Sequence, residues 1–278
     1  AADDSGNVFL ATGDGWFDAA HVPAGDVANS IVKIGLAHEV PTHNLLAHDR
    51  LPLLDYFTPF NQAKLSRHDQ DLGSGGVLLA RDPGDGHRQL LIHVGKEGTL
   101  YILDSNAFTA KNLHYCDGCG SDTQIMQELP LAIPGGVWGI PAYWNGRIYV
   151  SGSSDPVRAF SLRNGLVDAS VLSSTQEVFR YPGAGLAISS EGAKNAILWT
   201  LEVGAYDSKG PAILRAYDAT DLSSLLYASD RQAERDQAGG AVKFTVPTVV
   251  NGKVYVGGAS QLTVFGSLST APSHLAAH

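Results

Sequence analysis

One strand–turn–strand segment occurs twice in this sequence and restricts the fold more than any other feature. Residues 137–150 read Val-Trp-Gly-Ile-Pro-Ala-Tyr-Trp-Asn-Gly-Arg-Ile-Tyr-Val, and residues 242–256 carry a similar pattern around a second Asn-Gly. Asn-Gly between two apolar runs predicts a tight hairpin, because a type I′ turn needs positive φ at two successive residues. Asn145 and Asn251 are 251 − 145 = 106 residues apart, a spacing that fits two repeats of a common size. The chain is therefore predicted to consist of repeated antiparallel units.

Similar strand pairs precede and separate these two segments. The inner pairs are Leu90–Gly95 with Thr99–Asp104, Ile148–Gly152 with Val157–Ser161, Ala196–Val203 with Ile213–Asp218, and Val8–Gly13 with Ile31–Ile34. Outer strands are expected at Leu54–Phe57, Gln124–Leu129, Glu177–Arg180 and Leu225–Ala228. Short strands at regular intervals are typical of a sandwich, a barrel or a propeller. A fixed four-strand unit with Gly-rich links favours an all-β fold, a β-propeller of four-stranded antiparallel blades with almost no helix.

The order of the strands predicts an open set of blades. With the strands of each blade lettered A to D from the axis outward, the chain opens with B, C and D, continues through three whole blades and closes with A, B and C. We expect four to five blades of a ring of seven or eight, as one domain over residues 1–268 followed by a disordered tail at 269–278. Either the ring is small and closes irregularly, or an N-terminal half is missing, which is the favoured alternative. That half, or a partner chain, would complete the ring.

Composition excludes several classes of protein. The net charge of −9 argues against a nucleic-acid partner, because such a protein neutralises phosphates with clustered Lys and Arg. No apolar run reaches the roughly 18 residues that a membrane-spanning helix needs. The chain begins at Ala1 without Met or a signal sequence, so we expect a processed chain or an excised piece.

The cysteines, Cys116 and Cys119, stand in Tyr-Cys-Asp-Gly-Cys-Gly. A small disulfide-closed loop in an oxidising compartment, two free thiols, and a metal or redox site all remain open, and the disulfide is favoured. A zinc site would need two further ligands, and a c-type haem would need His where Gly120 stands.

Blade topology predicts that unusual polar residues gather on one face. Consecutive strands alternate in direction, so the B–C turns and the D-to-A links between blades lie on the same face. Eight residues fall in these segments: Asp14, Lys96, Glu97, Asp69, Asp71, Trp138, Arg235 and Asp236. Such a group around a channel fits a planar anionic ligand together with a cation. Each residue also has a structural interpretation, since Asp is a normal turn residue and Trp138 could pack between inner strands.

Four stretches resemble the pyrroloquinoline-quinone (PQQ) dehydrogenase propellers, the quinoprotein alcohol dehydrogenase-like group. Residues 8–14 look like that family's strand ending in Thr-Gly-Asn, and residues 25–32 look like its Gly-Asp-Asn…Ser-Ile-Val stretch. Phe57-Thr58-Pro59 precedes an Asp-rich loop, as in the family, and residues 88–104 follow its segment ending in Tyr-Val-Leu-Asp. The resemblance spans residues 7–105 and returns weakly near 134–150 and 240–265.

The resemblance implies a cofactor site. Asp14 would replace an Asn that ligates Ca²⁺, and Asp69 or Asp71 would be the catalytic base. Lys96 would contact the quinone oxygens, and Trp138 would lie beside the cofactor, although Val137 replaces the Asn of the family's Asn-Trp pair. The chemistry would be hydride transfer from an alcohol or sugar to PQQ, with Ca²⁺ polarising the quinone and a carboxylate accepting the proton.

The chain departs from the family in ways that keep other functions open. The repeated Thr-Gly…Trp docking motif is absent after Asp104 and after Asp218. The family's first metal carboxylate, its cofactor-floor Trp and its adjacent-Cys ring belong to an N-terminal part that this sequence does not contain. Three functions are therefore weighed: a quinone- and Ca²⁺-dependent dehydrogenase, a non-catalytic propeller serving as an interaction or assembly platform, and a hydrolase or lyase on a propeller scaffold. A periplasmic or extracellular location is expected in each case.

Overall fold

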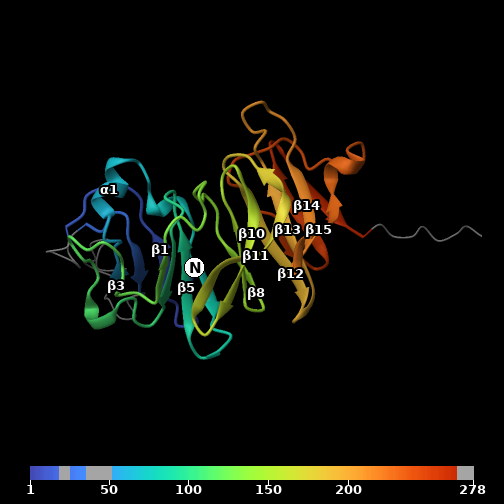
Figure 1. Ribbon diagram of the computed structural model, residues 1–278. Helices are drawn as coiled ribbons and strands as arrows, with labels where there is room; N and C mark the ends of the chain where they lie inside the picture. The colour runs from blue at the N-terminus through green and yellow to red at the C-terminus, as the bar shows by residue number, and fades with distance from the viewer. Residues whose placement is uncertain (19–25, 36–51, 268–278) are drawn as a thin grey trace, which may run out of the picture.

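The described residues of this all-β protein form five antiparallel sheets, which lie side by side in a row (Figure 1). The computed structural model describes residues 1–18, 26–35 and 52–267. In every sheet the strands pair in the order of the chain, each with the next. This up-and-down meander is the blade of a propeller, so the predicted all-β propeller fold is confirmed.

The sheets contain three, four, four, four and three strands. The first sheet consists of β1 (Val8–Ala11), β2 (Ile31–Ile34) and β3 (Leu53–Phe57). The second consists of β4 (Leu78–Arg81), β5 (Gln89–Val94), β6 (Leu100–Asp104) and β7 (Gln127–Leu129). The third consists of β8 (Ala142–Trp144), β9 (Arg147–Ser151), β10 (Asp155–Arg163) and β11 (Leu166–Phe179). The fourth consists of β12 (Ala184–Glu191), β13 (Lys194–Glu202), β14 (Ile213–Asp218) and β15 (Asp221–Ala228). The fifth consists of β16 (Thr248–Val250), β17 (Lys253–Gly258) and β18 (Gln261–Gly266).

Helical segments are short and lie in the connections. They are the helix α1 (Gln62–Arg67) and the 3₁₀ turns η2 (Leu72–Ser74), η3 (Ala110–Asn112) and η4 (Ser229–Gln232). The prediction of almost no helix is confirmed for the described residues. α1 and η2 lie in the link between the first two sheets, where they position the candidate site.

The strands in the middle of each sheet are apolar on both faces. Along β5, Leu91 packs against the first sheet, whereas Leu90 and Ile92 pack against the third. Successive side chains of a strand point to opposite faces of its sheet. A strand of a sheet that packs between two other sheets therefore has a continuous run of apolar residues. Four apolar clusters fill the four spaces between the five sheets. The core is thus a series of layers rather than one central mass.

The two predicted Asn-Gly hairpins have the expected geometry. Asn145 and Gly146 have φ of 46° and 74°, and Asn251 and Gly252 have φ of 50° and 70°. Each pair joins two neighbouring antiparallel strands, β8 to β9 and β16 to β17. The repeated hairpin therefore fixes corresponding positions in the third and fifth blades.

The predicted order of strands is confirmed, with one addition at the start of the chain. The Ala1 amino group donates to the Phe9 carbonyl, and the Phe9 amide donates to the Ala1 carbonyl, at 2.9 and 2.8 Å. The first residues therefore pair with the edge of β1 where strand A of the first blade belongs. The first and last sheets lie at opposite ends of the row (Figure 1). The predicted disordered tail at 269–278 falls outside the described residues.

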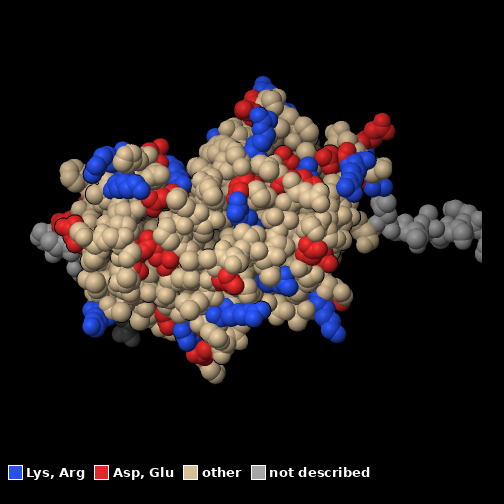
Figure 2. Space-filling model, viewed as in Figure 1, with Lys and Arg blue, Asp and Glu red and all other residues tan. Residues whose placement is uncertain are grey.

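Charges of both signs are dispersed over the face seen in Figure 2, without a broad basic area. Among the described residues, no helix is long and apolar enough to cross a membrane.

Candidate functional site

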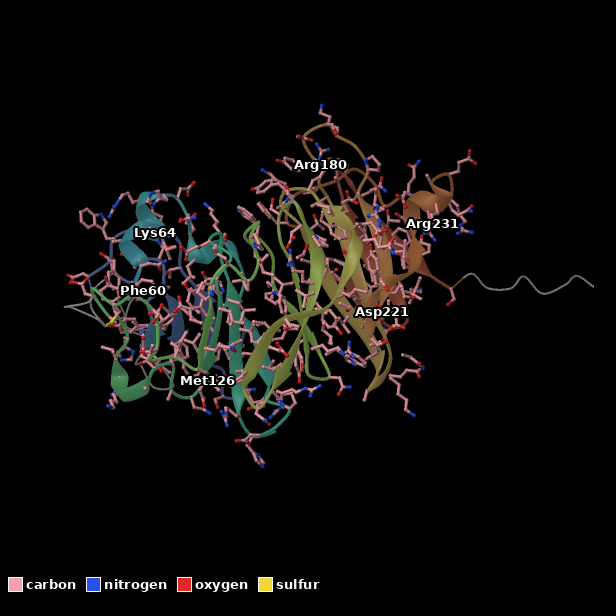
Figure 3. The ribbon with its side chains drawn as sticks, in the orientation of Figure 1. Phe60, Lys64, Met126, Arg180, Asp221 and Arg231 are labelled. Atoms are coloured by element: carbon pink, nitrogen blue, oxygen red, sulfur yellow. A yellow bond between two sulfur atoms is a disulfide. The ribbon has the colours of Figure 1, made fainter. Side chains whose placement is uncertain are left out.

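The links between blades and the B–C turns meet at one end of the strands, as the topology predicts. The Val137 amide, in the link after β7, donates to Gly95 in the turn after β5 at 3.1 Å, and the Ser153 amide donates to Gly136 at 3.0 Å. Lys64, Arg180 and Arg231 lie in three different links and project from the same edge in Figure 3. The backbones approach so closely that a Cβ on Gly136 would lie 2.4 Å from the Lys96 carbonyl oxygen. Glycine is therefore required in this link.

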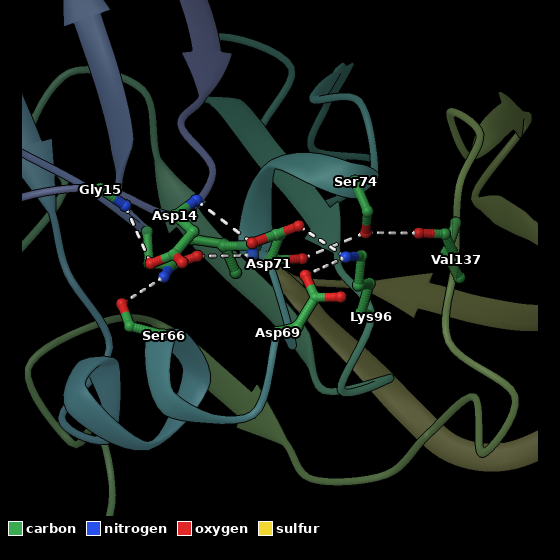
Figure 4. Close-up of polar contacts among 10 residues, drawn as sticks. Asp14, Gly15, Ser66, Asp69, Asp71, Ser74, Lys96 and Val137 are labelled. Carbon is green, nitrogen blue, oxygen red and sulfur yellow. Dashed lines mark hydrogen bonds and ion pairs between the residues drawn. The ribbon is translucent and has the colours of Figure 1, made fainter.

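Asp71 is the centre of a polar cluster at this end, between the first two blades (Figure 4). One carboxylate oxygen accepts from the Lys96 ammonium at 2.6 Å, and the other accepts from the Asp14 amide at 3.2 Å. Its carbonyl accepts from the Lys96 amide and the Ser74 hydroxyl, both at 3.1 Å. Asp71 thus joins a turn of the first blade to a turn of the second.

Asp69 completes the ion pairing of Lys96. Its Oδ1 lies 2.8 Å from Lys96 Nζ, and its side chain is 84% exposed. The hydrogen bond from Lys96 lowers the pKa of Asp69. Partial burial alone would lower the pKa of Lys96, but its bonds to Asp69 and Asp71 outweigh that effect and raise it. A general base for neutral pH is tuned in the opposite direction, toward a raised carboxyl pKa.

Asp14 lies beside this pair, but the described residues do not form a Ca²⁺ site. The Asp14 Oδ1 accepts from the Gly15 amide at 2.8 Å, an ordinary turn contact. Ca²⁺ takes six to eight oxygen ligands. Within residues 1–18, 26–35 and 52–267, no three Asp, Glu, His or Cys side chains are arranged to hold a metal ion. The Lys96 ammonium already neutralises part of the charge on Asp69 and Asp71, so a metal ion at Asp14 would need further ligands from outside the described residues.

The other residues predicted for this face belong to separate groups. Glu97 binds Lys64 at 2.8 Å and accepts from the Asn61 amide. Arg235 and Asp236 pair with each other at 2.6 Å, and the Tyr227 hydroxyl donates to Asp236. These pairs share the end of the molecule with the Asp71 cluster, but their side chains bond to other partners.

Trp138 is also directed elsewhere. Its ring meets the Tyr181 ring edge-on with centroids 5.0 Å apart, and it lines a crevice between the links of the later blades. Asp14, Lys96, Asp69 and Asp71, predicted to open onto one cavity, are brought together in an ion-pair network. Lys96 and Trp138, both expected at the cofactor, have different immediate neighbours.

One residue that positions this cluster has no role that the sequence alone indicates. The Asn29 side chain is fully buried, accepts from the Leu72 amide at 2.9 Å and donates to the Ser66 hydroxyl at 3.0 Å. Asn29 has φ of 49°, a conformation that Asn tolerates better than most residues. An Asn two residues before strand β2 is the available signal, but its partners lie 37 and 43 residues away in the chain.

The fold defines the class of this protein: a β-propeller protein whose described residues form consecutive blades. No family model matches the sequence, and no curated protein matches it either. Several solved structures are similar to it in fold. They include the β-propeller domain of Cps50 (Swd1) from Myceliophteria thermophila, at 12% identity and TM-score 0.44, covering 87% of this chain and 65% of that one.

Two further similar structures are BamB from Moraxella catarrhalis and a computationally designed protein, Ika4. BamB is 15% identical with TM-score 0.40, and the match covers 69% of this chain and 49% of BamB. Ika4 is 13% identical with TM-score 0.40, and the match covers 64% of this chain and 84% of Ika4. This chain therefore spans less than two thirds of BamB and of the Cps50 domain. Such distant likenesses carry no inference about function.

Proposed function

We propose that this protein is a non-catalytic β-propeller scaffold whose last described sheet packs against a further blade, supplied by a missing N-terminal half or by a partner chain. One observation carries the proposal: the sheet β16–β18 is apolar on the face directed away from β15. Leu262, Val264 and Val250 are 66%, 48% and 45% exposed. Single exposed apolar residues are ordinary, but a contiguous group on one sheet marks an interaction surface.

Alternation along the strands separates the two faces of this sheet. Val254 and Val256 are buried against the fourth sheet, together with the partly buried Phe265. Tyr255 lies between these two valines in the sequence, and Val264 is its direct partner on the neighbouring strand. They belong to the opposite face because side chains alternate along a strand. The sheet therefore has the composition of an inner layer, although the described residues cover only one of its faces.

The packing of the preceding sheets indicates what kind of partner fits this face. In the fourth sheet, Leu198 packs against the third sheet and Leu201 packs against the fifth. Each described interface joins two apolar sheet faces in this way. The continuation of this series is another antiparallel blade with an apolar face, so we commit to that occupant. Such a blade would also continue the ring.

The test uses the exposed and the buried faces of the same sheet. Leu262→Glu is expected to leave the melting temperature of the 278-residue chain unchanged and to reduce binding of the apolar dye ANS. Val256→Glu, on the buried face, is expected to unfold the last blade. Equal destabilisation by both variants would contradict the proposal, because Leu262 would then belong to the chain's own core.

Cross-linking identifies the occupant in the native protein. Lys253 shares the exposed face by alternation with Val254 and is itself exposed. We expect amine cross-links from Lys253 to a β-strand segment outside these 278 residues. Cross-links only to a second copy of this chain would make the site a self-association surface and would contradict a distinct partner.

A quinone-dependent dehydrogenase remains the second proposal, with PQQ and Ca²⁺ as cofactors and a location outside the cytoplasm. It is favoured by the convergence of Asp14, Asp69, Asp71 and Lys96, which the family resemblance assigns to one cofactor. The pairing of Cys116 with Cys119 agrees with an oxidising compartment. Calorimetric titration of the native protein with PQQ and Ca²⁺ tests it directly. Absence of heat at micromolar concentrations would exclude this proposal.

A further inference from the structure

Three aromatic rings from different parts of the chain surround one cation at the link end of the later blades. Tyr181 follows β11, Tyr206 follows β13 and Phe244 precedes β16. The Lys243 ammonium lies 4.7 Å from the Tyr206 ring centroid, 5.8 Å from that of Phe244 and 5.9 Å from that of Tyr181. All three distances are within the roughly 6 Å over which a ring face attracts a cation. We call Tyr181, Tyr206 and Phe244 the aromatic cage.

Lys243 is a weakly held occupant of this cage. Its side chain is exposed, and cation–π contacts at exposed sites are weak. A Lys ammonium is also a compact, strongly hydrated charge, so water competes with the rings for it. A cation whose charge is covered by methyl groups loses less hydration at the same place and gains more contact with the ring faces.

A narrow apolar crevice adjoins the cage. Phe244 and Trp138 line it, with Pro182, Val203 and Val246 among the other lining residues. It is narrow because β12 and the segment before β16 approach closely: a Cβ on Gly185 would lie 2.3 Å from the Thr245 carbonyl oxygen. The crevice is too narrow to admit a second ring, but its mostly apolar rim offers a surface that an aliphatic chain can contact.

The backbone at Phe244 departs from the usual conformation of a bulky residue. Its φ is 65°, in the left-handed region, and its side chain is 54% exposed. Non-glycine residues with positive φ are uncommon, and for a bulky residue the conformation is strained. Strain of this kind is often retained at ligand-binding sites.

We propose that the aromatic cage binds a quaternary-ammonium group carried on an aliphatic stem, with Lys243 as an internal occupant that the ligand displaces. The cage takes the methylated cation, and the crevice beside Trp138 takes the stem. Recognition of quaternary ammonium by aromatic rings is a known use of cation–π attraction. Two sources share this chemistry: a free choline-like molecule and a trimethylated lysine of another protein. The site is separate from the exposed face of β16–β18 and does not depend on the scaffold function.

Removing the internal occupant is the first step of the test. Lys243→Ala empties the cage without touching a ring, so we expect it to bind tetramethylammonium about fivefold or more tightly than the unmodified chain, measured by ligand-observed NMR. Tyr206→Ala in the Lys243→Ala background should abolish binding, whereas Tyr206→Phe should preserve it because the ring remains. Tyr115→Ala, which removes a ring that packs on Phe17 in another part of the molecule, should have no effect.

Charge must be separated from shape in the second step. A peptide with trimethyllysine is compared with the same peptide carrying unmodified lysine or an uncharged tert-butyl isostere of trimethyllysine. Preference for the trimethylated peptide over both supports the proposal. Equal binding of the isostere would overturn it, because the site would then be only an apolar crevice.

Four further results bear on the proposal. No gain from Lys243→Ala would overturn it, as would full binding by the folded Tyr206→Ala variant. Choline binding as tightly as the trimethyllysine peptide would assign the cage to a free small cation, and much tighter peptide binding would assign it to a modified protein; both support the cage.

Discussion

The Asp71 carboxylate illustrates how a single residue can connect two blades. Its side chain is 22% exposed and holds both the Lys96 ammonium and the Asp14 amide, whereas Asp69 contacts only the same ammonium from an exposed position. Asp71 differs from Asp69 by its bond to the Asp14 backbone amide. A surface ion pair alone contributes little to stability, and a bond to a backbone amide adds to it.

We therefore predict that Asp71→Ala lowers the free energy of unfolding by about 1 kcal/mol, and that Asp69→Ala changes it less. Asp69 also has φ of 54°, so Asp69→Gly removes an unfavourable conformation and should be tolerated. Urea denaturation of the three variants provides the measurement. If Asp69→Ala were the more harmful change, the cluster would not be organised around Asp71.

The His93 side chain on β5 is fully buried, and this burial affects how the stability of the protein depends on pH. Its Nε2 lies 2.9 Å from the Leu72 carbonyl oxygen. Burial lowers the pKa of His93 to about 4, although the contacts with the Leu72 and Gly76 carbonyls oppose the shift. The unfolded chain binds the proton near pH 6.5, so the stabilising effect of neutral His93 is complete above that pH and is lost as the pH falls toward 4.

His93→Gln should therefore reduce the loss of stability between pH 7 and pH 5 by about 2 kcal/mol, measured by urea denaturation at both pH values. The variant must be compared with the unmodified chain, because Asp122 acts in the opposite direction. Burial raises the pKa of Asp122 to about 6, so its contribution makes the free energy of unfolding fall, rather than rise, as the pH increases from about 4 to 6. His87→Gln, at an exposed position, is the matched control. If the free energy of unfolding of His93→Gln changed with pH as in the unmodified chain, His93 would not be buried as a neutral imidazole.

At the scale of elements, the inner strands can be predicted because their signals are local. Apolar runs on either side of Asn-Gly are sufficient to predict β8, β9, β16 and β17. The 14 residues of β11 are predicted only as a short outer strand, because its exposed edge carries many polar side chains and lacks a clear alternation. α1 is not predicted, because six residues are too short for a helical period to emerge.

The candidate site is predictable only in part, for a related reason. Topology alone places Asp14, Asp69, Asp71 and Lys96 on one face, and they do lie together. Which of them pair depends on contacts across 25 to 57 residues of chain, and these depend on the exact paths of the links. The aromatic cage joins two links and one B–C turn in the same way, so no local pattern in the sequence indicates it.

The two predicted hairpins provide a matched pair of glycines for measuring the energy of a turn. Gly146 and Gly252 both have positive φ, but a Cβ on Gly146 would lie 3.3 Å from the Leu162 carbonyl oxygen, whereas one on Gly252 would meet nothing within 4 Å. We predict that Gly252→Ala costs about 1 kcal/mol, the usual value of the left-handed conformation, and that Gly146→Ala costs more. Equal losses in thermal or urea unfolding would show that crowding at the first turn is negligible.

At the scale of the whole molecule, each blade should be stabilised mainly by the blades next to it in the row. The apolar clusters join each sheet only to its neighbours, so coupling is expected to pass from one blade to the next, as in other repeat proteins. Among the described residues, the third sheet has a neighbour on both sides, whereas the fifth packs only against the fourth. The same destabilising substitution should therefore affect more blades when it is made in the third sheet than when it is made in the fifth.

Val150 and Val256 test this expectation because they occupy equivalent places. Both side chains are fully buried, on the second strands of the third and fifth blades. Val→Ala therefore removes the same number of buried carbon atoms at each position. Each change should cost about 2 kcal/mol locally. Hydrogen exchange followed by mass spectrometry should show faster exchange confined to β16–β18 in Val256→Ala, and spread over the second to fourth blades in Val150→Ala. Faster exchange of β4–β7 in Val256→Ala, by the factor seen in β16–β18, would mean that the blades open as one unit and would contradict nearest-neighbour coupling.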